Sequence, residues 1–418
     1  MNQRLLKISI YVGILLVAGG LSHVLFRSFT SRPPSKPDPV STSGTPTPSN
    51  KQTGVLTFSG PKTEACPLNG ELFTADEKAI WAGRRPLAVM IENHLDSRPQ
   101  SGLQNADVVY EAVAEGGITR FMALYYCNVV KGAANKYDVG PVRSARVYYL
   151  DLVSEYGDYP LYAHVGGANC SAPKNMETGE LGPCTTNRKA LAIEKIEELG
   201  WTQKGTWSDL NQFSLAYKAC RREPERTGAV KDTEHTMYCS SSELWNIAAN
   251  RGLSNLTEVK KTPWDKNFVS WKFNQPDKYS GSPTATKANF DFWSSDKRYS
   301  VSWVYDTVKN KYLRQNGGQP HIDFNNGDQL DAKNIVLQFT KESRSIDVHG
   351  HNLYEVIGKG KGVLIQNGTK TDIDWTKANR TARTIFKETA TGKEVNFVPG
   401  RIWIEVLPLN ATVNYEAV

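Results

Sequence analysis

The sequence lacks the short fingerprints of the commonest enzyme classes. Its 418 residues contain no P-loop, no G-x-S-x-G elbow, no His-Glu-x-x-His pair and no dinucleotide-binding glycine motif. Runs of Lys and Arg are also missing, and the formal charge of +7 is spread along the chain. These absences argue against the usual hydrolase, NTPase and dehydrogenase functions. We expect no nucleic-acid partner and no cofactor.

A cysteine is missing where a lipid anchor would need one, close to the first long apolar run. Residues 8–26 are apolar and long enough to cross a bilayer as a helix, and residues 1–7, with Arg4 and Lys7, form a predicted cytoplasmic stub. The basic residues after the run oppose that orientation, but no small-x-small cleavage site follows. We therefore expect an uncleaved, single-pass signal-anchor, with the rest of the chain on the extracytoplasmic side. A removed signal peptide is the alternative.

The six cysteines show no C-x-x-C spacing, which argues against a zinc site or a redox pair. They are Cys66, Cys127, Cys170, Cys184, Cys220 and Cys239. An even number in an exported protein predicts disulfides. We expect Cys170–Cys184 and Cys220–Cys239, because each pair closes a short loop. Reduced, buried thiols are the alternative.

Three segments follow the predicted anchor. Residues 27–63 are dense in Pro, Ser and Thr and predict a disordered linker. Residues 64–261 alternate apolar, β-branched strands with helices such as RVYYLDLVSEYG, which predicts an α/β domain with a sheet layered by helices. Residues 267–418 hold short alternating segments separated by Gly-containing turns, which predicts a mainly β domain of sandwich or barrel type.

The segment Gly140–Arg146 carries two arginines where a predicted strand gives way to a helix. Ser144 is placed to cap that helix, and Arg146 lies in its first turn. Cations at a helix start oppose the helix dipole unless they serve an anion, so Arg143 and Arg146 predict a phosphate or carboxylate clamp. The alternative is that both arginines pair with Glu111 and Glu115 inside the fold.

Two acidic residues and a histidine are candidates for chemistry. Glu111 and Glu115 are four residues apart on one predicted strand, so they share a face and could act as acid and base, or could only neutralise Arg120, Arg143 and Arg146. His164 ends the strand PLYAHV before Gly166 and Gly167, where backbone can approach a ligand, although a structural role is the alternative.

The remaining candidates complete the predicted ligand site or offer weak metal chemistry. The neighbouring wall of the site is predicted to consist of Glu92, Asn93 and His94 together with Arg98, Pro99 and Gln100. His349 and His351 form a His-x-His pair with no third ligand evident, so we expect no metal there.

The motifs RPLAVMIEN, RPQSGL, ADVVYE, EGGITRF, GPVRSAR and AHVGG, followed by YLRQNGGQPHIDFNNGDQLDAKNIVLQF and VPGRIWIEVLP, resemble the YerB-like family of bacterial envelope lipoproteins. The resemblance implies an exported, membrane-held protein with two adjacent domains whose function is unknown. It places Arg98, Asp107, Glu111, Glu115, Arg120, Arg143 and Arg146 in recurring motifs without assigning them roles. The family's first motif more usually ends Asp-Asn, so the longer side chain of Glu92 puts its carboxylate in a different place.

Three functions are consistent with these observations, and the sequence favours binding over catalysis. The leading hypothesis is an anchored module that binds an anionic envelope ligand, such as a wall polymer or a lipid-linked phosphate, through Arg120, Arg143 and Arg146. The second is a wall-glycan hydrolase or phosphoglycosyl-type transferase that uses Glu111 or Glu115. The third is a scaffold for other envelope proteins, in which the charges are structural.

Overall fold

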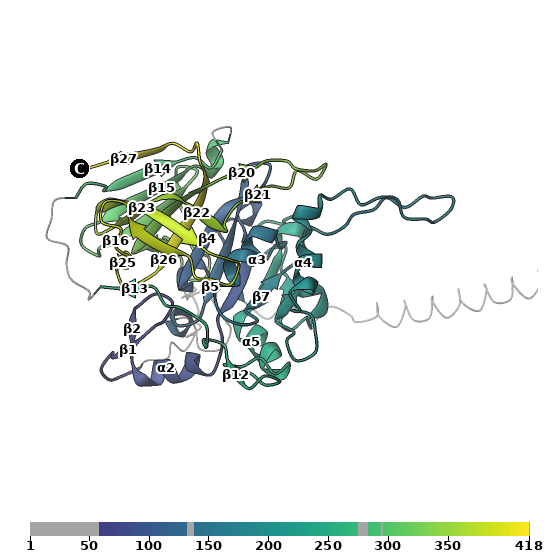
Figure 1. Ribbon diagram of the computed structural model, residues 1–418, viewed down its shortest axis with the longest axis horizontal. Helices are drawn as coiled ribbons and strands as arrows, with labels where there is room; N and C mark the ends of the chain where they lie inside the picture. Colours follow the sequence, from purple (N-terminus) through teal and green to yellow (C-terminus); the bar gives the residue numbers. More distant parts are fainter. Residues whose placement is uncertain (1–57, 132–137, 275–282, 294–295, 418) are drawn as a thin grey trace, which may run out of the picture. The chain divides into compact units, whose positions relative to one another are not determined.

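A ten-stranded mixed sheet forms the centre of the computed structural model, which describes residues 58–131, 138–274, 283–293 and 296–417 (Figure 1). In sheet order the strands are β24 (Ile385–Glu388), β23 (Thr369–Lys377), β22 (Gly358–Gln366), β19 (Asn334–Thr340), β26 (Ile402–Pro408), β4 (Val108–Glu115), β5 (Ile118–Tyr125), β3 (Leu87–Glu92), β7 (Leu161–His164) and β8 (Asp209–Asn211). The pairs β19–β26, β26–β4, β3–β7 and β7–β8 are parallel, and the others are antiparallel.

The central sheet draws five strands from each of the two predicted domains. They meet where β26 pairs with β4, with Ile402 opposite Val108 and Glu405 opposite Glu111. All described residues belong to one compact unit. The point at which the predicted domains divide stays a prediction.

A second, antiparallel sheet belongs to the C-terminal half. It contains β17 (Gln319–Pro320), β16 (Lys311–Asn316), β15 (Val301–Asp306), β14 (Lys287–Phe290), β27 (Val413–Glu416) and β18 (Asp331–Ala332). The Trp303 ring on β15 meets the Trp403 ring on β26 edge to face, with centroids 5.2 Å apart. This contact packs the second sheet on the central one, so the β-rich half is layered.

Helices are few and short in the described part of the chain. They are α2 (Ala75–Ala82), α3 (Val147–Val153), α4 (Ala192–Glu198) and α5 (Ser241–Asn250). Single 3-10 turns cover Leu95–Ser97, Leu103–Asn105, Asn128–Lys131, Arg188–Ala190, Gln212–Ser214, Thr233–His235 and Lys297–Tyr299. The fold is therefore mixed α/β with a mainly β C-terminal part, as the sequence predicts.

Smaller sheets complete the fold. The strands β6 (Asp138–Val139), β10 (Met237–Ser240) and β9 (Cys220–Arg222) make one of three strands. Two-stranded pairs join β1 (Glu64–Ala65) to β2 (Leu72–Phe73), β11 (Leu256–Thr257) to β12 (Thr262–Pro263), β13 (Lys272–Phe273) to β25 (Asn396–Phe397), and β20 (Glu342–Ser343) to β21 (Leu353–Tyr354).

All six cysteines are paired. The predicted disulfides Cys170–Cys184 and Cys220–Cys239 are confirmed, and a third joins Cys66 to Cys127. The predicted membrane segment, residues 8–26, and nearly all of the predicted linker lie outside the described residues. Within the described ranges, no helix combines the length and the apolar character that a bilayer crossing requires.

Buried ion pairs cross between the two halves of the sequence. Arg314 on β16 donates to Glu111 on β4 over 2.6 Å, and neither side chain is exposed to solvent. Glu405 lies beside Glu111 and accepts a hydrogen bond of 2.9 Å from the Trp303 indole. Burial, reinforced by the Glu111 charge, raises the pKa of Glu405 well above its usual range. Arg314 therefore pairs with Glu111, while burial beside that carboxylate favours the neutral form of Glu405.

The motif asparagine and arginine of the N-terminal half belong to this same network. Asn93 accepts hydrogen bonds from Arg98 (3.0 Å) and from Asn316 (3.1 Å), and Arg98 also reaches the Arg298 carbonyl. Burial and the nearby Arg314 charge lower the pKa of Arg98 to about 10. Asn93 and Arg98 are therefore engaged at the contact between the halves.

A second charged cluster crosses the chain at Glu155, just after α3. Lys377 and Arg383 donate to its carboxylate over 2.9 Å and 2.7 Å, and all three side chains are buried. Burial raises the pKa of Glu155, but the two cations outweigh it and lower that pKa to about 2. Two ionic contacts therefore bind the C-terminal strands to the N-terminal half.

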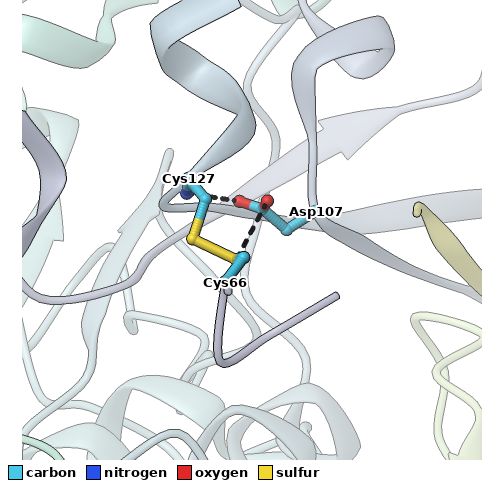
Figure 2. Close-up of side chains that lie close together, drawn as sticks. All are labelled: Cys66, Asp107 and Cys127. Carbon is cyan, nitrogen blue, oxygen red and sulfur yellow. Dashed lines mark hydrogen bonds between the residues drawn. A yellow bond between two sulfur atoms is a disulfide. The ribbon is translucent and has the colours of Figure 1, made fainter. Parts of the chain in front are cut away.

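Asp107 anchors the turn after β5 next to the Cys66–Cys127 disulfide (Figure 2). Its carboxyl group is buried and accepts the backbone N–H groups of Tyr126, Cys127 and Asn128 and the side-chain amide of Asn69. Burial raises the pKa of Asp107 to about 7, although these donors favour the charged form. Because both sulfur atoms are spent in the disulfide, this cluster is not a metal site.

We predict that Asp107→Asn destabilises the protein by about 2–4 kcal/mol, because the amide N–H₂ group would face buried donors that the carboxylate oxygen accepts. The free energy of urea unfolding measures the loss. Asp265→Asn, a substitution at an exposed position, is the control. A loss no larger than that of the control would contradict this role for Asp107.

We predict that Glu405→Gln flattens the fall of stability with rising pH. The folded-state pKa of Glu405 is raised, so its contribution to stability is complete below the unfolded pKa of about 4.3 and is lost as the pH rises through the folded-state value. Glutamine keeps the neutral form at every pH. The difference in unfolding free energy, variant minus wild type, should therefore increase from pH 5 to pH 8. The same difference for Glu225→Gln, at an exposed position, should stay constant. Parallel curves for variant and wild type would refute the idea.

Candidate functional site

A cavity of about 570 Å³ lies at the carboxyl ends of three neighbouring parallel strands. The strand β3 ends at Glu92, β7 ends at His164 and β8 ends at Asn211. Asn211 lines the cavity together with Gly166 and Gly167, which follow β7. This edge is where open α/β sheets bind ligands, because the loops that leave the strands diverge there.

Two arginines line this cavity, which we name the Arg143–Arg222 cavity. Arg143 donates through Nε to Glu92 over 2.9 Å, and Arg222 donates through Nη1 to the Thr233 carbonyl. Within the described ranges, both Nη groups of Arg143 and the Nε and Nη2 groups of Arg222 have no protein acceptor. Two guanidinium groups thus offer unused N–H donors to one space.

The two guanidinium groups repel each other. Burial lowers the pKa of Arg222, and the charge of Arg143 lowers it further, while Glu234 opposes the effect. Glu92, the acid nearest to Arg143, is already committed on both oxygens, to Arg143 and to Ser97 and His235. Burial raises the pKa of Glu92, but these partners outweigh it and lower that pKa to about 2. An added anion would relieve the repulsion.

The two glycines after β7 are required for different structural reasons. Gly166 has φ of +57°, a conformation that costs other residues energy. A Cβ atom on Gly167 would come within 2.9 Å of Ile193 on α4 and 3.2 Å of Ala145. Gly167 is thus required for close packing of α4, while Gly166 shapes the cavity wall.

The start of α3 differs from the prediction. The N-cap is Arg146, with no side-chain capping bond, and Ser144 lies before it and lines the cavity. Arg146 is buried and donates to the Ala145 carbonyl and, over 2.5 Å, to Glu115. The predicted clamp of Arg143 with Arg146 is therefore not formed, because the turn sends the two side chains to different partners.

Glu115 is held between Arg120 and Arg146 and does not line the cavity. Arg120 also donates to the Ser144 carbonyl over 3.2 Å. Burial raises the pKa of Glu115, but the charges of Arg120 and then Arg146 outweigh it and lower that pKa to about 2. The predicted pairing of these arginines with an acid of the strand is therefore present at Glu115.

Glu111 and His164 also do not line the cavity. The Glu111 carboxylate is fully buried and accepts from Arg314 and, over 2.6 Å, from Thr119. His164 is buried, with Nε2 2.6 Å from Asp209 and Nδ1 2.6 Å from the Gly166 carbonyl. His164 thus joins β7 to β8 and fixes the loop that shapes the cavity. Both of its ring nitrogens are used in these hydrogen bonds.

Arg222 is not among the site residues predicted from the sequence. It lies in the hairpin that the predicted Cys220–Cys239 disulfide closes, where β9 pairs with β10. The predicted disulfide could have pointed to Arg222, because closing that loop brings Arg222 beside the Thr233–His235 turn. The distance along the chain from Arg143 hid the connection.

We predict that Glu115→Gln destabilises the protein by about 1–3 kcal/mol near pH 6, because Arg120 and Arg146 then lack their counter-charge. The pKa of Glu115 is depressed, so its contribution is present above the unfolded value and is lost as the pH falls toward 2. The difference in unfolding free energy from wild type should shrink between pH 5 and pH 3. The exposed Glu177→Gln is the control, and a pH-independent difference would contradict the prediction.

Comparison with known proteins matches both halves of the chain to one family. Residues 71–187 match the N-terminal domain, and residues 289–404 the C-terminal domain, of a protein family of unknown function, DUF3048. Together the matches span more than half of the sequence.

One protein of Bacillus subtilis (strain 168), YerB, described as a candidate lipoprotein, is 26% identical over 332 residues, which are 78% of this chain and 82% of YerB. The crystal structure of the Bacillus subtilis YerB protein matches with a TM-score of 0.63 and 25% identity, over 84% of this chain and all of that one. The chain belongs to the YerB-like family, with the N- and C-terminal DUF3048 domains.

Proposed function

We propose that this protein is a membrane-tethered, extracytoplasmic binding module whose Arg143–Arg222 cavity holds an anionic cell-envelope ligand. The observation that carries the proposal is the pair of guanidinium groups with unused N–H donors in one cavity. Guanidinium groups suit phosphate and carboxylate groups, which they bind through paired hydrogen bonds.

The setting supports an extracytoplasmic place. The chain has three disulfides, and disulfides form and persist in oxidising compartments. The YerB relative is described as a candidate lipoprotein, and lipoproteins are held at a membrane. The apolar segment at residues 8–26 would supply the tether in this chain, where no cysteine lies close by.

The state of the acidic residues favours binding over acid–base catalysis. A general acid needs a pKa near the working pH and reach to the substrate. Glu111 is fully buried, and Glu115 is ion-paired with a pKa of about 2. The apolar side chains of Ile193 and Phe213, beside the arginines, suit a ligand with both a charged and a carbon-rich part.

We predict that the double variant Arg143→Ala/Arg222→Ala binds isolated cell-wall material at least tenfold more weakly than wild type, because each charge-assisted hydrogen bond contributes about 1.5–3 kcal/mol. The full-length chain in detergent micelles is co-sedimented with intact wall and with wall stripped of phosphate polymers. Retention by intact wall alone identifies a phosphate ligand, and retention by both identifies a carboxylate of the wall itself.

The matched control is Lys218→Ala/Lys361→Ala, which removes the same charge from exposed positions outside the cavity. Thermal melting checks that each variant is folded. Equal retention of wild type and the arginine variant, or an equal loss in the lysine control, would overturn the proposal.

A further inference from the structure

Three side chains of metal-binding type meet beside the carboxyl end of β3. His94 and Asp96 flank the first position of the 3-10 turn Leu95–Ser97, and His235 ends the turn Thr233–His235. One candidate ligand atom from each residue lies within 4.8 Å of the other two. No sequence pattern groups the three as ligands, because His235 follows the others by about 140 residues.

One pair of candidate ligand atoms is already at a distance that fits a transition-metal ion. His94 Nδ1 and Asp96 Oδ2 are 3.4 Å apart. Ligand atoms about 2.1 Å from a tetrahedral zinc ion are themselves about 3.4 Å apart, so this pair already has the required separation. The third atom must move closer.

The Glu92 carboxylate gives the cluster a feature that metal sites share. Its Oε2 atom lies 2.8 Å from Nδ1 of His235. Metal-binding histidines usually donate their second N–H to a carboxylate, which fixes the ring and leaves the other nitrogen for the metal. His235 is buried, so its ring is already oriented, and Nε2 of the neutral ring remains as a ligand.

The exposed side of the cluster provides the necessary mobility. The His94 and His235 rings are stacked, with centroids 4.5 Å apart and planes within 5°. One ring must turn out of this stack, because a metal lies in the plane of each ring that binds it. The side chains of His94 and Asp96 are 29% and 50% exposed, so His94 can turn. Its Nδ1 atom then gives up the backbone N–H of Asp96, from which it now accepts over 3.3 Å. The ammonium group of Lys231 now lies 3.4 Å from the Asp96 carboxylate, and this ion pair would break when Asp96 binds the metal.

We propose that His94, Asp96 and His235 bind a divalent transition-metal ion such as Zn²⁺, with Glu92 as the carboxylate that orients His235. Two imidazoles and one carboxylate suit zinc and leave a fourth position open to water or to a ligand. Glu92 also binds Arg143, so the metal site would share one carboxylate with the Arg143–Arg222 cavity. The proposal stands whether or not that cavity binds an anion.

The experiment is calorimetric titration of untagged, chelator-treated full-length chain in detergent micelles with Zn²⁺ alone. Wild type should bind one equivalent, and Asp96→Asn and His94→Gln should each weaken binding at least tenfold. Both substitutions are at partly exposed positions, and melting curves without metal check that the variants fold. Affinity should also fall as the pH is lowered, because protons compete for the imidazoles.

His349→Gln is the matched control, because His349 belongs to the other histidine pair of the chain, where His351 is 2.8 Å from Asp347. It should leave zinc affinity unchanged. The proposal is overturned if wild type binds no Zn²⁺ at micromolar concentration, if Asp96→Asn and His94→Gln bind as tightly as wild type, or if the loss occurs in His349→Gln instead.

Discussion

The buried ion pair of Arg314 with Glu111, which lies beside Glu405, is the constraint on which this structure depends. It lies where β4 of the N-terminal half pairs with β26 of the C-terminal half, beneath the second sheet. An unpaired charge at such a depth would cost several kcal/mol, so the residues must be assembled together. The Glu155 cluster repeats the arrangement at another point of contact. At both points a charge of one half is neutralised by the other half, which explains why polar motif residues lie in both.

The ion pairs inside the fold determine which charged side chains remain available to bind a ligand. Glu111, Asn93 and Arg98 hold the halves together, and Glu115 neutralises Arg120 and Arg146. Arg143 and Arg222 retain unused donors at the edge of the sheet, where the parallel strands end. Glu92 links this edge to His235 and thereby to the histidine cluster. A single carboxylate thus positions both features that we propose to be functional.

Local patterns predicted the secondary structure well, for physical reasons. The β-branched and aromatic segments PLAVMIE and ADVVYEAV became β3 and β4, and the alternating segment RIWIEVLP became β26. The Asn367-Gly368 turn joins β22 to β23 as a tight hairpin. Short loop closure predicted two of the disulfides. The N-cap of α3 was misplaced by two residues, because the backbone is still extended at Arg146, and Ser144 lines the cavity instead. Of the predicted site, Arg143, Ser144, Gly166 and Gly167 line one cavity.

The sequence by itself determined the kinds of element, their order and two of the three cysteine pairs, because these depend on neighbouring residues. Only the tertiary structure decided that both halves share one sheet, that Arg146 and Glu115 pair, and that Arg222 and His235 arrive from a distant hairpin. The reason is that the partner of a charged side chain is selected by strand pairing between residues far apart in the chain. Nothing in the spacing of arginines and acids along the sequence distinguishes a guanidinium group that is neutralised from one that is free to bind.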